Sequence, residues 1–143
     1  MITRSTHLRC TPARAFALFT ERASDWWPEG LRHSPDAKSK ISLVPGGRFW
    51  EQASDGHEIE LGRVVSWEPP QRLVLDFYPG TDEHHPTEVV VSFAAENGGT
   101  RVVVEHGPKP ESADLWARRA PGFERAWSRL LPALQKAADE SDS

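Results

Sequence analysis

His106 is the side chain in this sequence that is best placed to do chemistry. It follows Val102 and Val104 at alternate positions of a predicted strand, so these three side chains should point to one face of a sheet. A histidine in an apolar cavity could orient a carbonyl group or act as a general base. The alternative, which we favour, is a structural histidine bonded to backbone or to a neighbouring side chain.

Arg63, Asp76 and Tyr78 form a second group of candidate polar residues. The other residues on the predicted face of Arg63 are Ile59, Leu61, Val65 and Trp67. An arginine on that face could bind a carboxylate with both arms of its guanidinium group. Asp76 and Tyr78 share a face of the next strand, and either could form a hydrogen bond with a ligand. The alternative places all three on the solvated convex face or in a cross-strand ion pair.

Large aromatic side chains are the third feature that indicates a binding site. Concave sites rich in aromatic rings bind apolar ligands, but rings that each bury about 150–250 Å² can equally fill a core. The candidate lining residues of a cavity are Trp26, Trp27, Phe49, Trp50, Arg63, Phe77, Tyr78, His106, Trp116, Phe123 and Trp127. Trp116, Phe123 and Trp127 are spaced by seven and then four residues, which predicts one side of a helix that would gate the cavity.

Other motifs in the chain do not indicate a metal or a cofactor. The acidic and histidine residues of Asp82–His85 fall in a predicted hairpin loop and lack the paired spacing of zinc ligands. Gly46-Gly47 and Gly98-Gly99 are expected to be turns, because no helix follows them to bind phosphate. Cys10 is expected to be a small buried residue and not a nucleophile. We therefore expect no metal site and no cofactor.

Composition restricts the class of protein further. With 17 Lys and Arg against 21 Asp and Glu, the net charge is −4, which argues against a nucleic-acid partner. The single cysteine fits a reducing compartment, and neither a signal peptide nor a stretch of membrane-spanning length is present in the sequence. We expect a cytoplasmic protein with one domain over residues 1–143, of which residues 139–143 form a frayed polar tail.

The hydrophobic pattern predicts an α+β fold. Alternating apolar residues and turn signals predict strands over residues 2–10, 38–44, 48–52, 57–67, 72–78, 87–94 and 100–106. A helix is expected over residues 12–22, with a short helix or turn after it. From Glu111 the apolar residues recur every three or four positions. Pro121-Gly122 is expected to divide this helical region, and Pro132 to kink it. An antiparallel sheet that is closed by this helical region would enclose a space.

The chain resembles the START-like (SRPBCC) superfamily, and within it the activator-of-Hsp90-ATPase-homology branch. The matching segments are Trp26–Pro28, Pro45–Phe49, Gly62–Leu73, Gly99–Val102, Glu105–Gly107 and Gly122-Phe123 with Leu130 and Leu134. The resemblance implies a helix-grip fold, in which a curved antiparallel sheet wraps around a long C-terminal helix with an internal cavity between them. It implies no shared set of catalytic residues.

Three functions remain open from the sequence. The first is binding of a small hydrophobic or amphipathic ligand in the cavity. The second is a cyclase, hydratase or hydrolase that uses His106 with Arg63, Asp76 or Tyr78. The third, motivated by the resemblance, is a co-chaperone-like module that binds a protein partner or forms a homodimer. The aromatic set, together with few clustered ionisable groups, favours the first.

Overall fold

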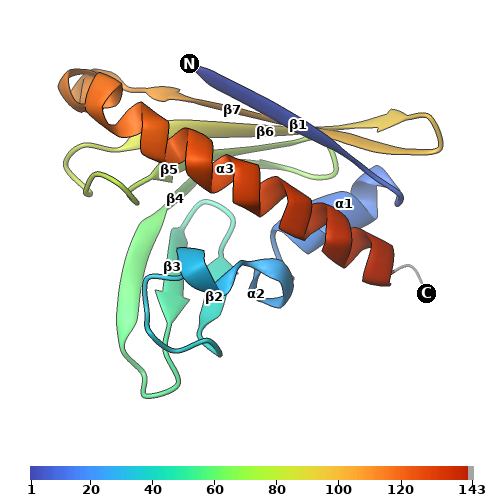
Figure 1. The fold of residues 1–143 in the computed structure, drawn as a ribbon, viewed down its shortest axis with the longest axis horizontal. Coiled ribbons are helices and arrows are strands. Elements are labelled where there is room, and N and C mark those ends of the chain that lie inside the picture. Colours follow the sequence, from blue (N-terminus) through green and yellow to red (C-terminus); the bar gives the residue numbers. More distant parts are fainter. Residues whose placement is uncertain (142–143) are drawn as a thin grey trace.

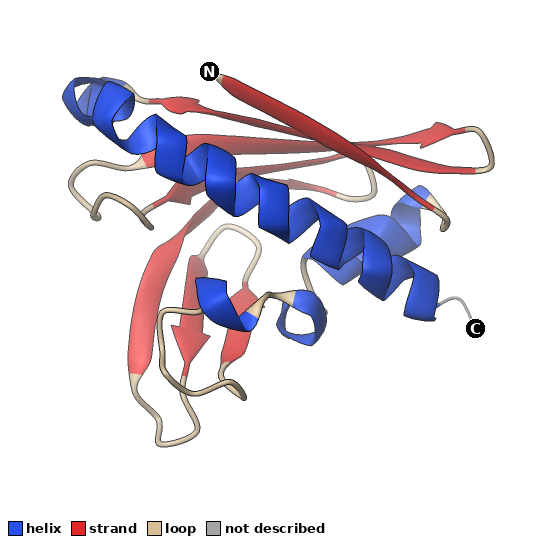
Figure 2. Cartoon of the chain, in the orientation of Figure 1, coloured by secondary structure: helices blue, strands red, loops and turns tan. Residues whose placement is uncertain are grey.

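The computed structural model describes residues 1–141, and the order of its elements agrees with the order predicted from the sequence (Figures 1 and 2). The strands of this part of the chain are β1 (Ile2–Leu8), β2 (Lys40–Leu43), β3 (Arg48–Gln52), β4 (Glu58–Glu68), β5 (Arg72–Phe77), β6 (Thr87–Glu96) and β7 (Gly99–Pro108). The helices are α1 (Pro12–Phe19), α2 (Ala23–Trp26) and α3 (Ala113–Ser141), with 3-10 turns at Glu29–Leu31 and Pro110–Ser112. The predicted α+β class is confirmed.

The strands form one antiparallel sheet in the order β1-β7-β6-β5-β4-β3-β2. Figure 1 shows β1, β7, β6 and β5 in one layer, from which β4, β3 and β2 bend away, while α3 crosses the whole width of the molecule. The sheet is thus a curled half-barrel that holds the long helix, which is the helix-grip arrangement that the resemblance implied.

The curvature comes with two irregularities in β4, and these correct one prediction. The register of β4 shifts against β3 between Phe49 and Trp50, and against β5 between Val64 and Ser66. An extra residue reverses the alternation of side chains beyond it. As a result Val64 is buried while Val65 is 57% exposed and Arg63 is exposed. The prediction that Arg63 and Val65 share the apolar face was wrong, because simple alternation does not survive a bulge.

Helix α3 is a single helix, so the expectation that Pro121-Gly122 would divide it is also wrong. Both Pro121 and Pro132 lie on its exposed side, where water can bond the carbonyl groups that a proline ring leaves unpaired. The opposite side is apolar and packs on the sheet. Its buried residues are Phe123, Trp127, Leu130, Leu131, Leu134 and Ala138. Burial of this face offsets the cost of two prolines, each about 3 kcal/mol in a helix interior.

Aromatic rings also pack the first helix, α1, against the sheet. Helix α1 places Phe16 against Trp67 and Phe93, with ring centroids 5.2 Å apart in both pairs. Thr11 caps α1, because its side chain accepts a hydrogen bond from the backbone N–H of Arg14.

At the C-terminus, α3 continues through Asp139 and Glu140 to Ser141, and the last two residues of the predicted tail lie outside the described residues. No helix in the described part of the chain is long and apolar enough to cross a membrane.

Candidate functional site

His106 on β7 is completely buried and bonded at both ring nitrogens. The indole Nε1–H of Trp127 donates to its Nδ1 at 3.0 Å. Since an indole nitrogen only donates, Nδ1 must be the accepting nitrogen and the proton lies on Nε2. Nε2 then donates to Oγ1 of Thr87 at 2.8 Å, and that hydroxyl donates to the carbonyl oxygen of Phe77 at 3.2 Å. The chain of donors is complete with a neutral histidine.

Aromatic rings surround this histidine on its remaining sides. The nearest is Phe123, whose centroid lies 4.2 Å from that of the imidazole, and Phe77, Trp116 and Trp127 follow at 5.3–6.2 Å. This burial lowers the pKa of His106 to about 3. His106 is therefore a neutral structural residue that connects β7, β6 and α3, as the favoured prediction had it.

A pocket of about 440 Å³ lies beside this aromatic core, between α3 and the loop that follows β5. We call it the α3 pocket. Its apolar walls are Trp27, Leu31, Phe77, Pro79, Pro121, Phe123, Ala126 and Leu130, and its other lining residues are Gly30, Arg32, His33, Gly80, Arg118, Arg119, Gly122 and Arg125. This volume falls in the range of about 300–1,000 Å³ that is typical of small-molecule sites.

Two glycines leave the space that the α3 pocket occupies. Gly80 adopts a φ of +84°, and a Cβ there would lie 2.7 Å from Cε1 of Phe123, so the loop can rest on the phenyl ring only without a side chain. Gly122 lies on the exposed side of α3, and a Cβ there would have no neighbour nearer than an Arg125 nitrogen at 3.8 Å. The surface of the helix is thus hollow at Gly122.

The opposite wall of the α3 pocket is a loop that a buried carboxylate holds in place. Glu51 on β3 is fully buried and accepts hydrogen bonds from the backbone N–H groups of His33 and Ser34 at 2.9 and 2.8 Å, and from the Ser39 hydroxyl at 2.9 Å. Burial alone would raise the pKa of Glu51, but these donors outweigh it and hold the pKa below its usual value. The segment that carries Arg32 and His33 is therefore fixed relative to the sheet.

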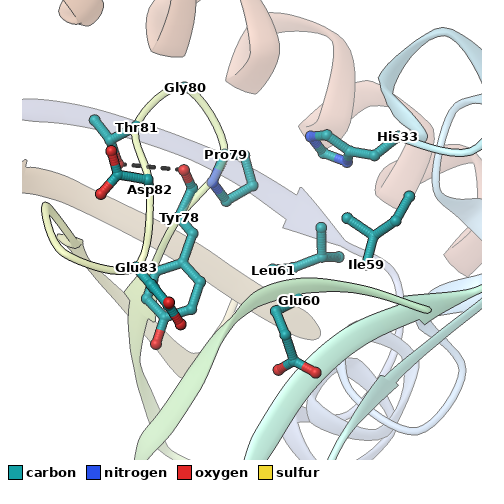
Figure 3. Close-up of a pocket in the computed structure, with 10 residues that line it drawn as sticks. All are labelled: His33, Ile59, Glu60, Leu61, Tyr78, Pro79, Gly80, Thr81, Asp82 and Glu83. Atoms are coloured by element: carbon teal, nitrogen blue, oxygen red, sulfur yellow. Dashed lines mark hydrogen bonds between the residues drawn. The ribbon is translucent and has the colours of Figure 1, made fainter.

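A second pocket of about 350 Å³ adjoins the first and shares His33, Pro79 and Gly80 with it (Figure 3). We call it the Tyr78 pocket. Figure 3 shows the carboxylates of Glu60, Asp82 and Glu83 around it. Burial, with a contribution from Asp76, raises the pKa of Tyr78 above 10, so the phenol stays protonated at neutral pH.

The family to which this chain belongs follows from a comparison with known proteins. The family model described as "Activator of Hsp90 ATPase homolog 1-like protein" matches residues 9–139. The chain belongs to this family. No curated protein sequence is significantly similar to the chain.

Solved structures with a similar fold include three that match nearly all of this chain. CalC from Micromonospora echinospora, a self-sacrificing resistance protein, is 25% identical with a TM-score of 0.72, and the match covers 98% of this chain and 94% of CalC. Protein NE0264 from Nitrosomonas europaea is 16% identical with a TM-score of 0.68, over 99% and 95% of the two chains. The Aha1 dimer from Colwellia psychrerythraea is 16% identical with a TM-score of 0.60, over 94% and 95%.

The candidate lining residues that we named from the sequence fall into three places. Trp27, Phe77 and Phe123 line the α3 pocket, and Tyr78 lines the other pocket. Buried or half-buried in the aromatic core, and outside both pockets, are Trp26, Phe49, His106, Trp116 and Trp127. Arg63 is exposed on β4, and Trp50 packs under the Arg48 guanidinium, 4.4 Å from its ring centroid, beside Glu60. Neither contributes to a pocket.

Asp76 forms an ion pair in the structure. Its carboxylate accepts a hydrogen bond from the Lys109 ammonium group at 2.7 Å. This ion pair joins the end of β5 to the segment after β7 and lies outside both pockets. Asp76 is thus bound to Lys109 and does not face a ligand site.

Sequence reasoning missed the arginines of the α3 pocket. Arg118 and Arg125 are seven residues apart, so the helical pattern alone could have placed them on one side of α3. No local signal could have placed Arg32 at the same pocket, because its position depends on the fold of the segment before β2. The positive charge of this pocket is a product of tertiary structure.

Proposed function

We propose that this protein binds a small apolar or amphipathic molecule in the α3 pocket. The observation that carries the proposal is the pocket itself, which combines an adequate volume with walls made of Trp27, Phe77 and Phe123. These rings are held by the core behind them, since Phe77 packs on Phe49 and Trp27 packs on Trp26. A site with rigid aromatic walls loses little conformational entropy when a ligand binds.

An enzymatic function has weaker support. A general base must reach a proton on its substrate, but the ring of His106 is fully buried and both of its nitrogens are already bonded. Arg63 and Asp76 lie away from the pockets. The polar groups named from the sequence therefore do not converge on one point in the structure.

A co-chaperone-like role has the family as its support. The exposed large apolar residues of the described chain are Met1 before β1, Val44 after β2 and Val65 on β4. Single exposed apolar residues are normal on a soluble protein and do not mark a docking surface. Ligand binding is therefore the function that the geometry favours. We propose the cytoplasm as the compartment, because a single buried cysteine, Cys10, fits a reducing environment.

A titration with N-phenyl-1-naphthylamine, a neutral dye that fluoresces in apolar sites, tests the proposal. We expect saturable binding, with amide chemical-shift changes in an NMR titration at Gly80 and Gly122. The turn at Asn97-Gly98, which lines neither pocket, should stay unchanged. Native mass spectrometry of the purified protein would reveal a co-purified ligand. Absence of both dye binding and a bound ligand would overturn the proposal.

A further inference from the structure

We infer that the ligand of the α3 pocket carries an anionic group, such as a carboxylate, sulfonate or phosphate, on its apolar body. This inference rests on the proposed function and adds the chemical class of the ligand. Its basis is the set of charged side chains that line the pocket. These include Arg32, Arg118, Arg119 and Arg125, whereas no aspartate or glutamate is among the lining residues.

The three arginines of α3 that line the pocket are free to bind an anion. Arg118, Arg119 and Arg125 are all exposed, and no ion pair between described residues includes any of them. Some other arginines of the chain are paired, as in Arg48 with Glu58 and Glu60. Even the nearest glutamate on the same helix, Glu124, is directed to Arg4 of β1 at 3.5 Å. Like charges around one pocket repel each other, and an anion bound among them would relieve this repulsion.

Arg32 supplies a fixed positive charge on the other side of the pocket. Its Nη2 donates to the Ser24 carbonyl oxygen at 2.7 Å, and its Nη1 donates to the carbonyl oxygen and hydroxyl of Ser39 at 2.6 and 3.1 Å. These acceptors are neutral, and the Glu51 carboxylate reaches Arg32 only through the Ser39 hydroxyl, so it offsets the guanidinium charge in part. Its Nε is buried without a hydrogen-bond partner among the described residues. Arg32 therefore contributes to the potential of the site, while the α3 arginines contact the anion.

The neighbouring Tyr78 pocket decides how such a ligand lies. Its lining holds Glu60, Asp82 and Glu83 and neither lysine nor arginine. The carboxylates of the Tyr78 pocket repel an anion, and the arginines of the adjoining α3 pocket attract it. The apolar body then lies on Phe77 and Phe123, and the charged group lies toward Arg118 and Arg125. The net charge of the whole chain is −4, so the positive charge at the α3 pocket directs anions to this one site.

The test compares two dyes that differ only in charge. 8-Anilinonaphthalene-1-sulfonate has the ring system of N-phenyl-1-naphthylamine and a sulfonate in addition. We expect the anionic dye to bind at least about fivefold more tightly, and its affinity to fall as ionic strength rises. The double variant Arg118→Gln with Arg125→Gln should remove this preference and leave the affinity for the neutral dye within about twofold.

A charge-matched control separates a specific site from the net charge of the protein. The double variant Arg9→Gln with Lys136→Gln also removes two positive charges, and neither residue lines the α3 pocket or the Tyr78 pocket. It should bind both dyes as the wild type does. Inorganic phosphate at millimolar concentration should not displace the sulfonate dye, because the apolar body supplies part of the affinity.

The outcomes distinguish the two proposals. Equal affinity for the two dyes, or equal losses in the arginine variant and the control, would overturn the anionic ligand and leave the proposed function intact. Failure of both dyes to bind, together with the absence of a co-purified ligand, would overturn the proposed function itself. Circular dichroism melts of both double variants establish that a loss of binding is not a loss of fold.

Discussion

The indole N–H of Trp127 donates to Nδ1 of His106, across 21 positions of sequence and between a helix and a strand, at 3.0 Å and out of contact with water. This single bond connects α3 to the centre of the sheet and fixes the tautomer of the histidine. A buried bond of this kind is costly to break from one side only, because the partner left behind stays unsatisfied.

Removal of this donor should destabilise the protein in two distinguishable steps. Trp127→Phe keeps an aromatic ring but leaves Nδ1 of His106 without a donor, for a loss of about 1–3 kcal/mol in unfolding free energy. Trp127→Ala also creates a cavity, for a loss of about 3–5 kcal/mol. Urea unfolding monitored by circular dichroism measures both. If Trp127→Ala were as stable as the wild type, the packing of α3 described here would be incorrect.

His106 should make stability depend on pH. Its pKa is lowered from 6.5 to about 3 in the folded protein, so below pH 6.5 the unfolded chain binds a proton that the folded chain does not. Stability is therefore highest above pH 6.5 and falls as the pH drops toward 3. The contribution lost is roughly 2 kcal/mol at pH 5, from about 1.4 kcal/mol for each pKa unit.

The variant His106→Gln, which can still accept from Trp127 and donate to Thr87, measures this contribution. Unfolding free energies of both proteins between pH 4.5 and 8 should differ in slope below pH 6.5, with the wild type the steeper. If the two plots of unfolding free energy against pH had the same slope, folded His106 would take up its proton with a pKa that folding does not lower.

The buried carboxylate of Glu51 should stabilise the loop that carries Arg32. Glu51→Gln replaces an acceptor of three hydrogen bonds by an amide whose NH₂ faces backbone donors, for a loss of about 2–3 kcal/mol at pH 7. The folded pKa of Glu51 lies below 4.5, so its contribution is present above pH 4.5 and is lost as the pH falls further. Thermal melts at pH 7 and pH 4 should therefore show a smaller difference at the lower pH.

The exposed Glu58→Gln on the neighbouring strand is the matched control for Glu51→Gln. Its ion pair with Arg48 is exposed to solvent and should contribute less than about 1 kcal/mol. Similar losses in the two variants would contradict an anchoring role for Glu51.

Two substitutions at Gly122 should separate stability from ligand binding. A glycine in a helix costs about 1 kcal/mol relative to alanine, and nothing crowds a Cβ at this position. Gly122→Ala should therefore raise the melting temperature. Gly122→Leu should also be folded, but its side chain occupies the α3 pocket and should weaken dye binding about tenfold. Unchanged dye affinity in Gly122→Leu would place the bound dye elsewhere.

Much of the fold was determined by local sequence pattern. Alternation of Val102, Val104 and His106 predicted an inward histidine, and turn signals such as Asn97-Gly98 placed the hairpins correctly, because each depends on a few neighbouring residues. The apolar spacing from Phe123 to Leu134 likewise identified the inner side of α3. The aromatic residues were recognised as a group, although the sequence left open whether they line a cavity or fill a core.

Tertiary structure alone decided the site. The bulges of β4 turned Arg63 outward, and the buried face of α3 carried the helix through Pro121. The buried Glu51 fixed the segment that brings Arg32 to the same pocket as Arg118. Each of these depends on contacts between residues far apart in the chain, whose free energies outweigh local preference. The sequence by itself determined that this protein is a sheet wrapped around an aromatic helix, and packing decided that its pocket opens beside that core with a positively charged wall.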